Sequence, residues 1–183
     1  MSMARASALL DRAVLAHRQQ RVLRAAVLVA TVAFLWLVVL AGGSLHGVVS
    51  AGLLVLAVLA ALMPDSSAPL FLVLGLAGRW WVAVPDPWSG WTLAAAVLLL
   101  AVHLASTLGS YGPPALAVPG ELLRTWAGRA AVMLAVTALV WLVAGLFTTL
   151  ALPGNVPVLA VALGLVVGWI ALLGRRLVTR DGD

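Results

Sequence analysis

The chain has 183 residues, of which 64% are hydrophobic and 9% charged, and its formal net charge is +5. Soluble domains carry about 25% charged residues, so a water-soluble globular protein is excluded and lipid is the expected solvent. Nucleic acid is excluded as a partner, because the basic residues flank apolar segments and form no basic face of their own.

The first 24 residues are predicted to form a cytoplasmic, amphipathic and basic segment (1–24). Apolar residues from Met3 to Val14 share one helical face, opposite Arg5 and Arg12. Such a helix beside a membrane span is expected to lie in the lipid interface; the alternative is a docking helix for a cytoplasmic partner. A cleaved signal is disfavoured, because the first apolar run begins only after this segment.

Six apolar runs follow, and they predict an all-α, polytopic membrane protein. Its single transmembrane domain covers 25–173, and a cytoplasmic tail follows at 174–183. A spanning helix needs ~20 residues, with ~17 acceptable, so the third run is marginal and a re-entrant segment is its alternative. The runs are Ala25–Leu40, Val48–Met63, Leu70–Val84, Thr92–Leu108, Ala130–Leu150 and Val156–Leu173.

The arginines orient these spans. All eleven basic residues are arginines, and only Arg79 lies inside a run. With six spans the others face one side, and the loops 42–47, 85–91 and 151–155 on the other side contain none. With five spans, every arginine after residue 120 would face outward, although cytoplasmic loops are the ones that retain arginine. We therefore expect six spans with both termini in the cytoplasm.

Arg79 is the first candidate for a functional or pairing residue, because an arginine within a span is costly. It lies six residues before Pro85, about 9 Å of helical rise from the outer boundary. We expect its side chain to reach outward, with Asp86 as counter-ion; the alternative is a buried pairing or an anion-binding role. Trp80 and Trp81 beside it are expected in the aromatic belt.

His103 is the second candidate. No acidic residue or other histidine occurs within the apolar runs, so a metal site or proton relay is disfavoured. We expect an interhelical hydrogen bond instead, with Ser106 or Thr107 among the candidate partners. His46, in the first outer loop, is expected to be solvated.

A short elbow helix is predicted at Pro119–Trp126, before the fifth run. That run also resembles the first: residues 24–38 align without gaps on 129–143, and nine of the fifteen positions are identical. The first and last hairpins are therefore candidates for pseudo-repeats. The alternative is the common composition of membrane spans, with an inner arginine and a deeper tryptophan as anchors.

Small residues mark a helix-packing face on the last run. Ala160, Gly164 and Gly168 recur every four residues, the small-xxx-small spacing that lets helices approach closely. The expected partner is another helix of this chain, a second copy or another membrane protein. By contrast, the sequence contains no paired carboxylates, H-E-x-x-H, G-x-S-x-G or Walker A motif. We expect no enzyme activity, no cofactor and no metal.

Several loop motifs resemble a known group of proteins. These are Met63–Leu70 followed by Trp80-Trp81, then Tyr111-Gly112-Pro113-Pro114, and Arg124–Arg129. They resemble small uncharacterised multi-pass membrane proteins of actinobacteria, which are often encoded beside MoxR-type AAA+ ATPases. The resemblance covers about residues 20–175 and implies no activity, only a partnership with an ATPase-linked membrane system.

Three function classes follow from these observations. The first is a non-catalytic scaffold or subunit of a membrane assembly, favoured by the small-residue faces. The second is a small transporter or channel, favoured by Arg79, His103 and the internal similarity. A membrane enzyme is third. The absence of lysine and the abundance of Ala, Leu, Val and Gly are typical of a GC-rich bacterial genome, so the expected location is a bacterial plasma membrane.

Overall fold

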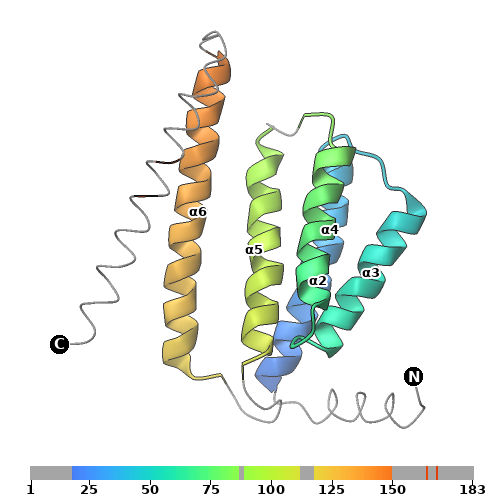
Figure 1. Ribbon diagram of the computed structural model, residues 1–183, viewed down its shortest axis with the longest axis vertical. Helices are drawn as coiled ribbons and strands as arrows, with labels where there is room; N and C mark the ends of the chain where they lie inside the picture. Colours follow the sequence, from blue (N-terminus) through green and yellow to red (C-terminus); the bar gives the residue numbers. More distant parts are fainter. Residues whose placement is uncertain (1–17, 87–88, 112–117, 150–163, 165–167, 169–183) are drawn as a thin grey trace, which may run out of the picture. The chain divides into compact units, whose positions relative to one another are not determined.

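All regular secondary structure in the described part of the chain is α-helical, as the apolar runs predict. The computed structural model describes residues 18–86, 89–111 and 118–149, together with Gly164 and Gly168. These residues form α2 (Arg18–Leu40), α3 (Gly47–Leu62), α4 (Ala68–Ala83), α5 (Trp91–Gly109) and α6 (Gly120–Thr149) (Figure 1). Residues 1–17 of the predicted segment 1–24, the tail at 174–183 and most of the run Val156–Leu173 lie outside the described residues. Residues 18–24, which were predicted to belong to that separate segment, are the first turns of α2.

Three of these helices are long and apolar enough to cross a membrane, namely α2, α5 and the part of α6 from Gly120 to Leu146. The other two, α3 and α4, have 16 residues each. At ~1.5 Å per residue they are about 24 Å long, shorter than a ~30 Å hydrocarbon core. Every predicted run before residue 149 lies on one of the five helices.

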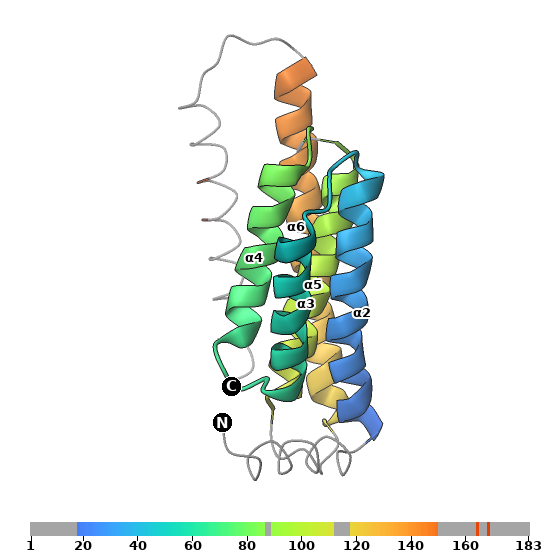
Figure 2. The same ribbon diagram turned by 90° about the vertical axis from the view of Figure 1, so that its right-hand side faces the viewer.

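The chain divides into two compact units, Met1–Ala135 and Val136–Asp183, and α6 continues from the first into the second. Within the first unit, α2 to α5 form an antiparallel bundle in which α2 and α4 each contact both α3 and α5 (Figure 2). We call the end where α2 begins, with Arg18, Arg21 and Arg24, the arginine end. The loops after α2 and α4 lie at the opposite end.

The bundle core is built around the middle and second half of α2. Phe34 is fully buried, and its ring meets the edge of Trp80 from α4 at a centroid distance of 5.8 Å and an interplanar angle of 63°. Leu72 and Leu76, earlier on α4, are also fully buried. The expectation that Trp80 belongs to the aromatic belt is therefore wrong. Trp81, the next residue, points away from the core and is 71% exposed.

A tight turn closes the connection from α2 to α3. Gly42 adopts φ +82°, a left-handed conformation that glycine adopts without steric cost. The Gly43 amide then donates to the Val38 carbonyl at 2.9 Å. This hydrogen bond holds Gly43 against the end of α2, and a Cβ at this position would lie 2.8 Å from the Val38 oxygen and 2.9 Å from that of Ala83.

The predicted elbow helix does not exist as a separate element. Residues 120–126 are the first turns of α6, which continues without a break to Thr149. The helix continues because Gly120–Thr149 contains no proline. Its first turn is closed by a hydrogen bond of 3.2 Å from the amide of Leu123 to the carbonyl of Pro119. Arg129 stacks over Trp126, one turn earlier, with Cζ 5.4 Å from the ring centroid.

A long-range hydrogen bond ties the beginning of α6 to that of α2. The backbone amide of Val118, two residues before α6, donates to Oε1 of Gln19 at 3.0 Å. Gln19 directly follows Arg18, the first residue of α2. The first turns of α6 therefore start at the arginine end of the bundle.

Candidate functional site

Arg79 lies on α4, one turn before the helix ends, and its side chain is buried. It is 6% exposed, and Nη2 of its guanidinium lies 3.4 Å from Nδ1 of His46. His46 is exposed and immediately precedes α3. Since α3 and α4 are antiparallel neighbours, the end of one meets the beginning of the other, and this contact forms at the end opposite the arginine end.

The chemistry of the two side chains determines which one donates the hydrogen bond and which one accepts it. A guanidinium has donors only, so Nη2 donates and Nδ1 of His46 accepts. The ring can accept only when it is neutral, with its proton on Nε2. Within the described residues, Nε of Arg79 is buried and has no hydrogen-bond partner. The guanidinium is therefore incompletely satisfied.

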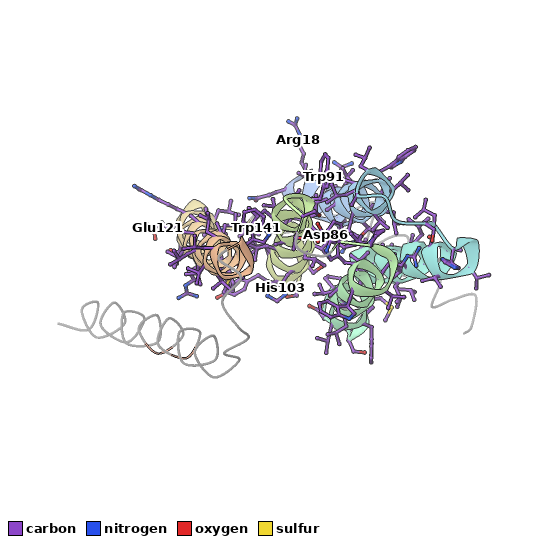
Figure 3. The ribbon with its side chains drawn as sticks, turned by 90° about the horizontal axis from the view of Figure 1, so that it is seen from above. Arg18, Asp86, Trp91, His103, Glu121 and Trp141 are labelled. Atoms are coloured by element: carbon purple, nitrogen blue, oxygen red, sulfur yellow. The ribbon has the colours of Figure 1, made fainter. Side chains whose placement is uncertain are left out.

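These observations answer the question that the sequence left open for Arg79. The side chain is buried at the end of the bundle opposite the arginine end and is only 6% exposed. Its partner in the structure is His46, a residue that the sequence predicts to be solvated in a loop. Asp86 lies exposed in the loop after α4 (Figure 3).

His103 lies on α5 and is exposed (Figure 3). The hydroxyl of Thr107, one of its expected partners, donates at 2.8 Å to the backbone carbonyl of His103 and not to its imidazole. The hydroxyl of Ser106 is buried and has no partner among the described residues. The structure therefore does not bring Arg79 and His103 into one described site.

Buried polar groups at the arginine end were not predicted from the sequence. Gln20 is fully buried, and neither atom of its amide has a hydrogen-bond partner in the described part of the chain. A Cβ on Gly109, at the end of α5, would lie 4.0 Å from Oε1 of Gln20. The sequence signal was a pair of glutamines among arginines, which is equally typical of an exposed interfacial segment.

The predicted packing face is described at two of its three residues. Gly164 and Gly168 are exposed, and a Cβ built on either would have no atom within 4 Å. Ala160 lies outside the described residues. Packing of this face against another helix therefore stays a prediction. The described contacts include no helix that packs against Gly164 or Gly168.

Comparison with known proteins identifies no relative: no protein-family model, curated protein or solved structure matches the chain. In the described residues, no group of three or more His, Asp or Glu side chains is placed to hold a metal ion. The Arg79–His46 contact is a polar side-chain contact between the beginning of α3 and the end of α4.

We predict that the Arg79–His46 contact couples the two side chains by about 0.5–1.5 kcal/mol, the usual net value of a hydrogen bond. A double-mutant cycle with Arg79→Leu and His46→Ala measures this coupling as the non-additive part of the change in unfolding free energy. His103→Ala is the matched control, because its exposed ring has no described partner. Strict additivity of the two substitutions would show that the contact contributes nothing.

Proposed function

We propose that the chain is a non-catalytic integral membrane protein of the bacterial plasma membrane, acting as a scaffold or subunit of a membrane assembly. The proposal includes six spans, namely α2 to α6 and the run Val156–Leu173, with both termini in the cytoplasm. The amphipathic part of the predicted N-terminal segment, Met3 to Val14, would lie on the cytoplasmic surface.

The observation that carries the proposal is the distribution of apolar side chains on the bundle. The four helices α2 to α5 bury a hydrophobic core between them, yet each of them also carries large apolar side chains that are exposed. One example on each helix is exposed, namely Trp36, Val55, Phe71 and Val97. Large exposed apolar side chains on every helix of the bundle favour a surface that is covered by lipid or by another apolar chain.

The hydrogen bond between Gln19 and Val118 supports the proposed orientation. It brings the beginnings of α2 and α6 to the same end of the first unit. Arg18, Arg21 and Arg24 on α2 and Arg124 and Arg129 on α6 lie in those beginnings. A single arginine-rich end is what retention of arginine on the cytoplasmic side requires.

The proposed partner binds through the last span. Gly164 and Gly168 offer a face without side chains, and membrane helices associate through such faces because dispersion contacts replace the missing hydrophobic force. The partner is a second copy or another membrane protein. The resemblance to proteins encoded beside MoxR-type ATPases favours a subunit of an ATPase-linked membrane system.

The second candidate function is a small transporter or channel for a small solute or ion. The burial of Arg79 and the unpartnered Nε favour it, because a buried guanidinium with a free donor is suited to bind an anion. Anion flux into proteoliposomes that is lost in Arg79→Gln but kept in His103→Ala would support this function over the scaffold.

Assembly is tested by introducing bulk on the predicted packing face. We expect Gly164→Leu and Gly168→Leu to lower the fraction of oligomer or of co-purified partner protein in detergent, whereas Ala162→Leu, on another face of the same run, leaves it unchanged. Native mass spectrometry measures the stoichiometry. A monomer without partners in every variant, with all three substitutions equally tolerated, would contradict the proposal.

A further inference from the structure

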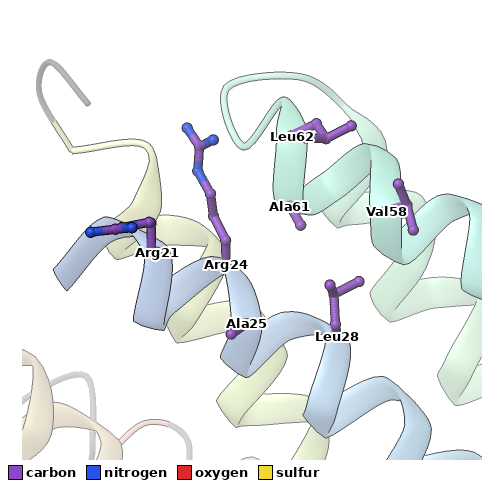
Figure 4. Close-up of a pocket in the computed structure, with 7 residues that line it drawn as sticks. All are labelled: Arg21, Arg24, Ala25, Leu28, Val58, Ala61 and Leu62. Carbon is purple, nitrogen blue, oxygen red and sulfur yellow. The ribbon is translucent and has the colours of Figure 1, made fainter. Parts of the chain in front are cut away.

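A hollow of about 290 Å³ lies between α2 and α3 at the arginine end (Figure 4). Ala25 and Leu28 of α2 face Val58, Ala61 and Leu62 of α3 across it. Its walls are therefore aliphatic, and its volume is close to the lower limit of ~300 Å³ for small-molecule pockets. A hollow of this size and lining fits part of one hydrocarbon chain.

Two arginines of α2 line the end of this hollow, although the side chain of Arg21 is directed away from it in Figure 4. Arg24 extends from α2 along the opening between the helices, and Arg21 lies one turn earlier (Figure 4). The Nε and Nη1 atoms of Arg24 are buried, yet they have no hydrogen-bond partner within the described residues. Like charges three residues apart on a helix also repel each other. An anion beside Arg24 would supply the missing acceptors, and the exposed side chain of Arg21 would have to turn toward it to share the anion and relieve the repulsion.

We propose that this groove is a binding site for an anionic phospholipid. The phosphate of the headgroup accepts hydrogen bonds from Arg24 and from the exposed, adjustable side chain of Arg21. One acyl chain enters the hollow between α2 and α3. Basic pockets between membrane helices on the cytoplasmic side bind anionic headgroups in this way, and the aliphatic walls distinguish a lipid from free phosphate.

The site deepens the proposed function and rests on the membrane location of the bundle. It does not depend on which side of the membrane the arginine end faces. Lipid retention in detergent therefore tests the site, and labelling of the loops from either side of a membrane tests the orientation. The lipid site can therefore fail its test while the proposed orientation passes its own, and the reverse.

The experiment measures lipids retained by the full-length protein in detergent, using native mass spectrometry after exposure to equal amounts of phosphatidylglycerol and phosphatidylcholine with identical chains. We expect selective retention of phosphatidylglycerol. Arg24→Gln should lower it about fivefold or more, which corresponds to ~1 kcal/mol, because the phosphate loses its charge-assisted hydrogen bonds to the guanidinium. Arg18→Gln is the matched control, because Arg18 extends away from the bundle on the same helix (Figure 3).

Two further variants separate the headgroup from the chain. Arg24→Lys should keep part of the retention, since lysine preserves the charge but not the guanidinium geometry. Ala25→Leu fills the hollow without changing the charge and should lower retention, and inorganic phosphate should not displace the lipid. Circular dichroism confirms that each variant is folded. Equal retention of both lipids, equal losses in Arg18→Gln and Arg24→Gln, full retention in Ala25→Leu, or displacement by phosphate would each overturn the proposal.

Discussion

Replacing Phe34 with alanine should destabilise the bundle by about 3 kcal/mol, at the lower limit of the ~3–5 kcal/mol range for buried phenylalanine. The side chain is fully buried and forms the edge-to-face contact with Trp80. In a lipid-exposed bundle the transfer of apolar area from water contributes little, since lipid tails are also apolar. The cost therefore comes from the cavity and from the lost dispersion contacts.

The matched control is Trp36→Ala, two residues away on the same helix. Trp36 is 65% exposed, and we expect its loss to change the unfolding free energy by less than about 0.5 kcal/mol. Unfolding in a titration of mixed micelles, followed by circular dichroism, measures both variants. Similar costs for Phe34→Ala and Trp36→Ala would mean that Phe34 is not in a packed core.

Replacing Gly43 with alanine is the second change with a large expected effect. The new Cβ would lie 2.8 Å from both Cγ1 and the carbonyl oxygen of Val38 and 2.9 Å from the oxygen of Ala83. A side-chain methyl can rotate away, but the two backbone oxygens belong to the ends of α2 and α4. Relief of the clash requires these ends to separate, at a cost of about 1–3 kcal/mol.

Two other glycines provide the controls for this substitution. Gly78→Ala on α4 introduces a Cβ with no atom within 4 Å, so we expect it to be neutral or to stabilise the helix slightly. Gly75→Ala meets only Cδ2 of Leu53 at 2.8 Å, the flexible end of a side chain, and should cost less than Gly43→Ala. The same unfolding titration ranks the three; a neutral Gly43→Ala would contradict the observed close approach.

The sequence predicts the helices well because their signal is local. Long apolar runs separated by Pro, Gly and Asp are sufficient to locate helices, and the described part of each of the first five runs lies on one of the helices α2 to α6 to within one residue. Three of these helices are long and apolar enough to cross a membrane, so the six spans stay a prediction. The elbow before the fifth run was mispredicted for a related reason. Tyr111–Pro114 and Pro119 indicated a break, but the break falls before Gly120, and no residue after it interrupts the helix.

Side-chain environments were predicted less well, because they depend on which helices are neighbours. Trp80 and Trp81 are identical in type and adjacent, yet only Trp80 faces Phe34. Arg79 meets His46 because α3 and α4 pack side by side, and a sequence separation of 33 residues hides this contact. Gln20 falls within the predicted basic segment 1–24, and nothing in its local pattern shows that α5 ends beside it.

The proposed orientation is tested most directly by cysteine accessibility, because the chain contains no cysteine of its own. Single cysteines at Ser44 and Ser89, in the loops at one end of the bundle, should react with a membrane-impermeant thiol reagent in intact cells. Cysteines at Ser67 and Ser110, at the arginine end, and at Thr179 should react only after permeabilisation. Labelling of Ser67 or Thr179 in intact cells would contradict six spans with a cytoplasmic arginine end.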